Sequence, residues 1–205
     1  MGFCRYCLAA TQDTIQRVIL TSDLDIRQAT IKLRPADDAD RHAIHQLYLS
    51  AFAEDERTDV AAVALELLGD EAVGGNLTLV ALVDQRIIGH VSFSPVAING
   101  ISGGAFILAP LAVDPGFQGQ GIGCRLVQEG LAKLSEAGID QVFVYGDPAY
   151  YGRFGFHAAP AEPFAPPQQL EYPFGWQLLN LGASPVDLKG GQLTVVAPLN
   201  KPCLW

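Results

Sequence analysis

Three glycines at alternate positions, Gly119, Gly121 and Gly123, stand where an apolar segment gives way to a helical pattern. The segment before them, residues 106–113, predicts a buried strand that Pro110 interrupts with a bulge, because proline cannot donate to a β-ladder. From residue 125 the apolar side chains recur at helical spacing, which places the glycines at a helix N-terminus. The N–H groups of a first helical turn have no partner inside the helix, and an absent side chain lets an anion come close. The sequence therefore predicts an anion site of the kind that binds phosphate.

Two common phosphate-binding motifs do not fit these residues. A dinucleotide fingerprint that starts at Gly119 requires a glycine at position 124, where the chain has Cys124. A P-loop counted from position 116 requires a lysine at position 122, where the chain has Ile122. The pattern that does fit is Gln118-x-x-Gly121-x-Gly123 after a broken strand. It resembles the pyrophosphate-binding segment of the GNAT superfamily of acyl-CoA N-acyltransferases. The alternative is a glycine-rich turn that binds nothing.

A second segment carries the same resemblance. Tyr151, followed four residues later by Gly155 and Phe156, resembles the GNAT segment that closes over the thioester of the cofactor. The run 146–156 as a whole resembles a YhbS-like subgroup of predicted GNAT acetyltransferases. Together the two segments extend the resemblance over roughly residues 30–160.

The resemblance implies acetyl-CoA as the co-substrate, with no metal. Main-chain groups of Leu111 and Val113 would pair with the pantetheine arm as a further strand would, and main-chain N–H groups of residues 118–124 would bind the pyrophosphate. Only Gln118 is expected to contribute much through its side chain. The expected cofactor-binding residues are Leu111, Ala112, Val113, Gln118, Gly119, Gln120, Gly121, Ile122, Gly123, Cys124 and Tyr151.

The implied reaction moves an acetyl group to a primary amine by direct attack in a ternary complex. Cys124 is a poor candidate for an acyl-enzyme nucleophile because it falls in the pyrophosphate loop, away from the thioester. Tyr151 is the expected general acid, since a phenol with a pKa of about 10 is protonated at neutral pH and can donate to the leaving thiolate. Tyr150 is the alternative if the helical turn is displaced by one residue, and both rings could instead only pack.

The general base has no motif. Glu54, at the end of an expected helix, is the candidate that we favour, and Glu56, His90 or a chain of water molecules are alternatives. Because the base is uncertain, a catalytically inactive CoA-binding regulatory module is an alternative function. An O-acyltransferase would differ only in the acceptor.

The remaining patterns predict the elements that position these residues. Strands are expected at residues 29–33, 77–83, 87–98, 106–113, 141–145, 176–181 and 193–197, the last two as a hairpin. Helices are expected from Asp37 or Asp38 to about residue 52, at 59–68, from the glycines to about 137, and as one or two turns before Gly155. With the resemblance, the fold class is α/β. It has a mixed, mostly antiparallel GNAT-like sheet of about seven strands, splayed after the bulge and flanked by about four helices.

We expect residues 30–205 to form one domain, preceded by an extension of residues 1–29. The 205-residue chain carries 13 basic and 22 acidic side chains, a net charge of −9, which disfavours nucleic acid as a partner and suits a cationic amine acceptor, either a small molecule or a peptide. No apolar run approaches the ~20 residues of a membrane helix, and residues 1–20 lack the apolar core of a secretory signal, so we expect a cytoplasmic protein that does not bind membranes. Neither Cys4 and Cys7 nor His42 and His45 have the companions that a metal site requires. A homodimer is possible through the C-terminal strands.

Overall fold

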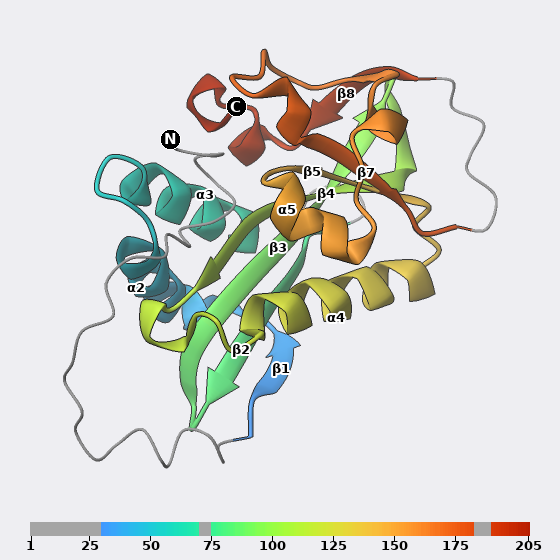
Figure 1. Ribbon diagram of the computed structural model, residues 1–205. Coiled ribbons are helices and arrows are strands. Elements are labelled where there is room, and N and C mark those ends of the chain that lie inside the picture. Colours follow the sequence, from blue (N-terminus) through green and yellow to red (C-terminus); the bar gives the residue numbers. More distant parts are fainter. Residues whose placement is uncertain (1–29, 70–74, 183–189) are drawn as a thin grey trace.

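The computed structural model describes residues 30–69, 75–182 and 190–205, and the expected extension of residues 1–29 lies outside them. Their main feature is an eight-stranded sheet in the order β1-β2-β3-β4-β5-β7, with β8 beside β3 and β6 beside β8 (Figure 1). The strands are β1 Lys32–Pro35, β2 Leu77–Val83, β3 Arg86–Ile98, β4 Ile101–Val113, β5 Gln141–Tyr145, β6 Phe164–Ala165, β7 Trp176–Asn180 and β8 Gly191–Val195.

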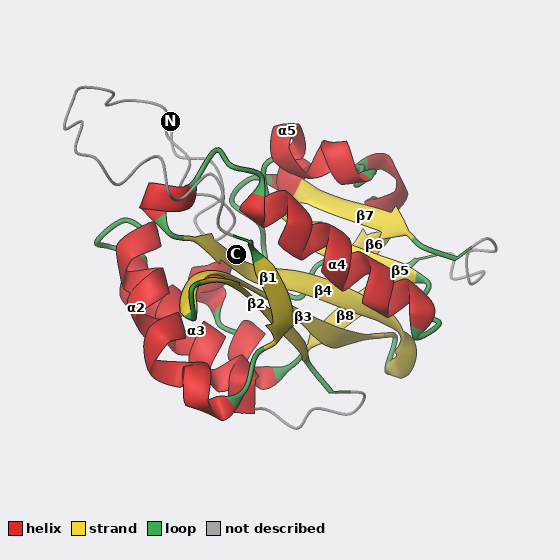
Figure 2. Cartoon of the chain, turned by 90° about the horizontal axis from the view of Figure 1, so that it is seen from below, coloured by secondary structure: helices red, strands yellow, loops and turns green. Residues whose placement is uncertain are grey.

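Within the described residues, four α-helices cover the two faces of this sheet: α2 Arg41–Ala51, α3 Arg57–Gly69, α4 Ile122–Glu136 and α5 Pro148–Tyr151. Figure 2 shows α2 and α3 on one face and α4 and α5 on the other. The side chain of Asp37 accepts the Ala39 N–H at 2.9 Å, as expected of a cap, but it caps a short 3₁₀ turn, and the α-helix proper begins at Arg41. Apolar side chains of both helical layers pack on the sheet and form two buried clusters.

The sheet is mostly antiparallel, and its one parallel neighbour pair on the main path is β4–β5. The helix between these two strands, α4, is therefore a crossover connection, as the sequence predicts. The predicted bulge is present. Ser92 of β3 faces both Ala109 and Pro110 of β4, because the register shifts between Val91↔Leu111 and Phe93↔Leu108. The fold class is confirmed, with eight strands in place of about seven.

The expected C-terminal hairpin is wrong. β7 pairs with β5 over residues 176–180, whereas β8 crosses to the other side and pairs with residues 96–98 of β3. Each strand finds an unpaired edge of the existing sheet, which satisfies more main-chain groups than an isolated two-stranded ribbon would. Among the described residues, no helix combines the length and the apolar character that a membrane crossing requires.

Candidate active site

The end of β4 has an open edge. Its pairing with β5 stops at Leu108↔Val144, yet β4 continues to Val113 with only β3 as a partner. The N–H of Asp114 donates to the Ile88 carbonyl of β3 at 2.9 Å. Main-chain direction alternates along a strand, so the N–H and C=O groups of Leu111 and Val113 point away from β3, toward the open side. The sheet therefore splays at this position.

The glycine loop follows immediately. Gly119 and Gly121 have φ values of +73° and +78°, in the left-handed region that favours glycine. Gly121 is the N-cap of α4 and supplies no capping side chain. In the described part of the chain, no protein group accepts the N–H groups of residues 119–124; the first N–H that is paired is that of Arg125, which donates to the Gly121 carbonyl at 3.0 Å. Unpaired N–H groups at a helix N-terminus suit an anion.

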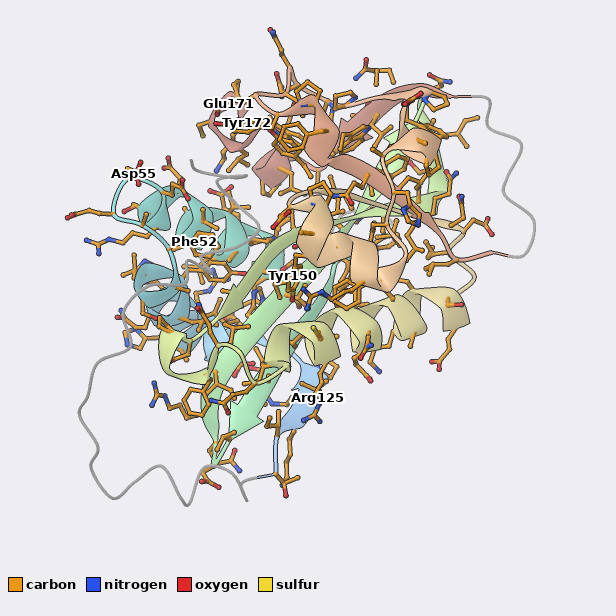
Figure 3. All side chains as sticks on the ribbon, in the orientation of Figure 1. Phe52, Asp55, Arg125, Tyr150, Glu171 and Tyr172 are labelled. Carbon is orange, nitrogen blue, oxygen red and sulfur yellow. The ribbon has the colours of Figure 1, made fainter. Side chains whose placement is uncertain are left out.

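A cavity of about 580 Å³ joins the open edge to the glycine loop. Figure 3 labels two of the side chains that border it, Phe52, the residue after α2, and Tyr150 from α5. Of the expected cofactor-binding residues, nine line it: Leu111, Ala112, Val113, Gln118, Gly119, Gly121, Ile122, Gly123 and Cys124. Gln120 does not line it, and its side-chain amide donates to the Gly116 carbonyl at 3.4 Å. The Gln118 amide donates to the Val113 carbonyl at 3.1 Å, at the edge of the cavity.

Of the two adjacent tyrosines, Tyr150 lines the cavity and Tyr151 lies in the core. Tyr150 is half-buried and lines the cavity, and its hydroxyl lies beside Gly123. Tyr151 is completely buried behind it and does not line the cavity; its ring lies edge-on to Tyr150 at 5.0 Å and to Phe156 at 5.8 Å between centroids. Successive residues of a helix point about 100° apart, which explains why only one of the two reaches the cavity.

Comparisons with known proteins agree with this geometry. Residues 74–158 match the model of an acetyltransferase (GNAT) domain. The chain is 33% identical over 159 residues to YjhQ of Escherichia coli K12, an uncharacterized N-acetyltransferase, and this match covers 75% of the chain and 86% of that relative. The chain belongs to the GNAT acetyltransferase family.

Solved GNAT structures share the fold. YhbS of Escherichia coli, solved in complex with CoA, superposes with a TM-score of 0.75 at 31% identity over 84% of this chain and 93% of that one. A GNAT acetyltransferase of Brucella melitensis, solved with acetyl-CoA, gives a TM-score of 0.68 at 31% identity, covering 84% and 99%. The predicted membership of a YhbS-like GNAT group is confirmed.

The GNAT cavity also contains side chains that sequence reasoning did not select. Arg153 lines it, with its guanidinium 4.7 Å from the centroid of the Tyr150 ring and 3.7 Å from the Cys124 sulfur. Ala51, the last residue of α2, and Phe52, its C-cap, also line the cavity, and Asp147 caps α5 by accepting the Ala149 N–H at 2.8 Å. No motif marks Arg153 or Phe52, because both reach the cavity through tertiary packing. Asp147 follows a strand and precedes a proline, which is a helix-cap signal.

The base candidates lie apart from the cavity. The Glu54 side chain is 89% exposed, pairs with Arg57 at 3.3 Å and does not line the cavity, and Glu56 does not line it either. His90 is fully buried under α2, and its Nδ1 lies 2.9 Å from the Tyr48 hydroxyl. Burial lowers the pKa of His90 to about 3, a shift that the nearby Asp40 carboxylate opposes. His90 is therefore neutral at physiological pH and a weak base.

Metal ligands are not brought together in the part of the chain that is described: no group of three or more His, Cys, Asp or Glu side chains could hold an ion. The Cys4 and Cys7 pair lies outside that part.

Proposed function

We propose that this protein transfers an acetyl group from acetyl-CoA to a primary amine by direct attack in a ternary complex. The observation that carries the proposal is the row of unpaired N–H groups at residues 119–124, which lies at one end of a cavity that follows the open edge of β4. Such a row fits a diphosphate, and an open strand edge fits a chain with amide groups. That YhbS and the Brucella enzyme were solved with CoA and acetyl-CoA supports the assignment.

The protein's own groups would act mainly by positioning. Leu111 and Val113 offer main-chain N–H and C=O groups to the pantetheine amides, and Gln118 would release or share the Val113 carbonyl. The guanidinium of Arg153 places positive charge beside the diphosphate end, where a protein of net charge −9 otherwise repels a polyanion. Holding the two reactants together supplies a large share of the rate enhancement of such a transfer.

The chemical step needs one proton donor and one proton acceptor. The acceptor nitrogen attacks the thioester carbonyl carbon, the C–S bond breaks, and the amine proton leaves to solvent. The thiolate takes a proton from a phenol, which solvent then reprotonates. We assign this phenol to Tyr151, as the sequence pattern predicts, because the Tyr150 hydroxyl borders the cavity beside Gly123, at the diphosphate end and away from the thioester. Tyr151 is buried behind Tyr150, so α5 would have to turn when acetyl-CoA binds. Glu54, the base expected from the sequence, does not line the cavity, so a path of water molecules would carry the amine proton to solvent.

The test is turnover. The protein is incubated with acetyl-CoA and a panel of primary amines, amino acids, peptides and alcohols, and free thiol is followed together with the mass of the acylated product. Calorimetry measures acetyl-CoA binding in parallel. Thiol release that requires an amine supports the proposal. Binding without turnover across the panel would favour the regulatory module, acylation of alcohols alone would favour an O-acyltransferase, and no binding would overturn both.

A further inference from the structure

A second cavity lies just past the bulge of β4, on the α3 side of the sheet. Its volume is about 30 Å³, and its walls include Ala109 and Pro110 at the bulge, Val60 and Val63 of α3, Tyr145 of β5 and Trp205. One water molecule needs roughly 10–15 Å³ of such volume, so the cavity has room for about two groups of that size. Because the walls are almost entirely hydrocarbon, water inside would find few partners, and an alkyl group is the better occupant.

The position of this cavity follows from the direction of β4. A cofactor whose diphosphate lies at the glycine loop and whose arm follows the strand passes Val113 first and Leu111 next. The two residues after Leu111 in the same direction are Pro110 and Ala109, which form the near wall of the small cavity. The far end of the arm would therefore lie beside the Ala109 and Pro110 wall of the small cavity.

The far wall is fixed in place. The rings of Tyr145 and Trp205 are stacked, 6.1 Å apart and inclined by 13°. The Tyr145 hydroxyl accepts the Tyr172 N–H at 2.9 Å, and the Trp205 indole donates to the Leu199 carbonyl at 2.9 Å. The C-terminal turns that carry Trp205 lie near α3 (Figure 1). They are tied to α3 by Lys201, whose ammonium lies 2.8 Å from the Glu66 carboxylate. A wall held at this many points sets an upper limit on what fits.

We propose that this cavity is an acyl-chain pocket. With room for about two carbons beyond the carbonyl carbon, it would let the enzyme use propionyl as well as acetyl thioesters. The inference rests on the proposed transferase function. The acceptor amine is a poor occupant, since an ammonium group would lose its hydration in an apolar site with no compensating charge. The acyl chain is uncharged and is delivered there by its covalent bond to the arm.

Val63 is the best position for a test. It is 2% exposed, lines the cavity and can gain or lose carbon without adding a polar atom. Val63→Ile fills part of the cavity and Val63→Ala enlarges it. Leu67→Ala is the matched control, because Leu67 is equally buried on the same helix but does not line the cavity. Melting temperatures establish that each variant is folded.

The measurement is kcat/KM for acetyl-, propionyl- and butyryl-CoA with one amine, together with the affinity of each thioester determined by calorimetry without acceptor. In the unmodified enzyme we expect kcat/KM for propionyl-CoA to lie within about fivefold of that for acetyl-CoA. The value for butyryl-CoA should be at least about tenfold lower, since one misplaced methylene lowers kcat/KM by about 10-fold or more. Val63→Ile should lower the ratio of kcat/KM for propionyl-CoA to that for acetyl-CoA by about tenfold. Val63→Ala should raise the ratio of butyryl-CoA to acetyl-CoA, and Leu67→Ala should leave both ratios unchanged.

The possible outcomes distinguish a failure of the acyl pocket from a failure of the proposed transferase function. Failure to bind any of the thioesters overturns the proposed function. Acetyl transfer or acetyl-CoA binding with propionyl more than about fiftyfold worse in the unmodified protein overturns the acyl pocket alone. So does a Val63 series that changes the KM of the amine but not the chain-length ratios, because the cavity would then belong to the acceptor. If a variant fails to fold, the chain-length profile of the unmodified protein still decides.

Discussion

The hydroxyl of Tyr150 lies against Gly123: a Cβ atom added at Gly123 would come within 2.5 Å of that oxygen. The side chain from α5 thus reaches the first turn of α4, where the N–H groups are unpaired. Only glycine at position 123 leaves room for the Tyr150 hydroxyl, so the close packing of α5 on α4 requires this glycine.

Gly123→Ala should lower the affinity for acetyl-CoA by about tenfold or more, which corresponds to about 1.4 kcal/mol. The added methyl group would push against both the Tyr150 hydroxyl and an anion at the helix N-terminus. Calorimetry measures the change. Gly152→Ala is the control, since its φ of −57° is ordinary and an added Cβ there has no atom within 4 Å.

A double variant separates the two causes of that loss. If the methyl group acts by excluding phosphate, adding Tyr150→Ala does not restore affinity. Full restoration by Tyr150→Ala would mean that Gly123 serves only to accommodate the tyrosine ring, and the phosphate assignment would lose its support.

The two adjacent phenols should differ in their effect on turnover. Tyr151→Phe should lower kcat by about 10²-fold with little change in acetyl-CoA affinity, because it removes the proton donor and keeps the ring. Tyr150→Phe should leave kcat within about threefold, because the Tyr150 hydroxyl lies beside Gly123, at the diphosphate end of the cavity. The reverse order, with Tyr150→Phe the inactive variant, would assign the donor to the phenol that already lines the cavity.

Arg153 should contribute to cofactor binding through its charge. Arg153→Met is expected to weaken acetyl-CoA binding by about fivefold at low salt and by less at high salt, where screening reduces the interaction. Arg125→Met, in the first turn of α4, is a charge-matched control, because Arg125 does not line the cavity and donates to the Ile31 carbonyl at 3.1 Å. Equal losses in both variants would indicate a general effect of net charge and no direct contact.

His90 should make the folded protein sensitive to acid. Its pKa is about 3 when folded and close to 6.5 when unfolded, so between these values the unfolded chain binds a proton that the folded chain does not. The free energy of unfolding therefore falls with falling pH, by at most about 1.4 kcal/mol per pH unit from this group.

Urea denaturation from pH 7 to pH 4 tests this dependence. His90→Gln should show a shallower loss of stability than the unmodified protein, although its stability at pH 7 is lower, because a buried partner of Tyr48 is changed. His42→Gln, at an exposed position of α2, should follow the unmodified protein. Identical slopes for all three proteins would contradict the lowered pKa.

Local chemistry explains how much of this molecule could be predicted. A proline inside an apolar strand, glycines before a helical pattern and a hairpin turn act over a few residues, so β2, β3, the bulge of β4 and the α4 N-terminus follow from the sequence. The partners of β7 and β8 could not be predicted, because strand pairing depends on which edges the rest of the sheet leaves unpaired. To predict which of Tyr150 and Tyr151 faces the cavity, one must know how the four-residue helix α5 is rotated about its axis. Arg153 and Trp205 reach their cavities only through tertiary packing.

A crystal structure of the protein with CoA tests the central claim most directly. We predict diphosphate oxygens at hydrogen-bonding distance, about 3 Å, from main-chain N–H groups of residues 119–124, with pantetheine amides paired to Leu111 and Val113. CoA bound at another surface, with those N–H groups turned to water or to the protein itself, would contradict it.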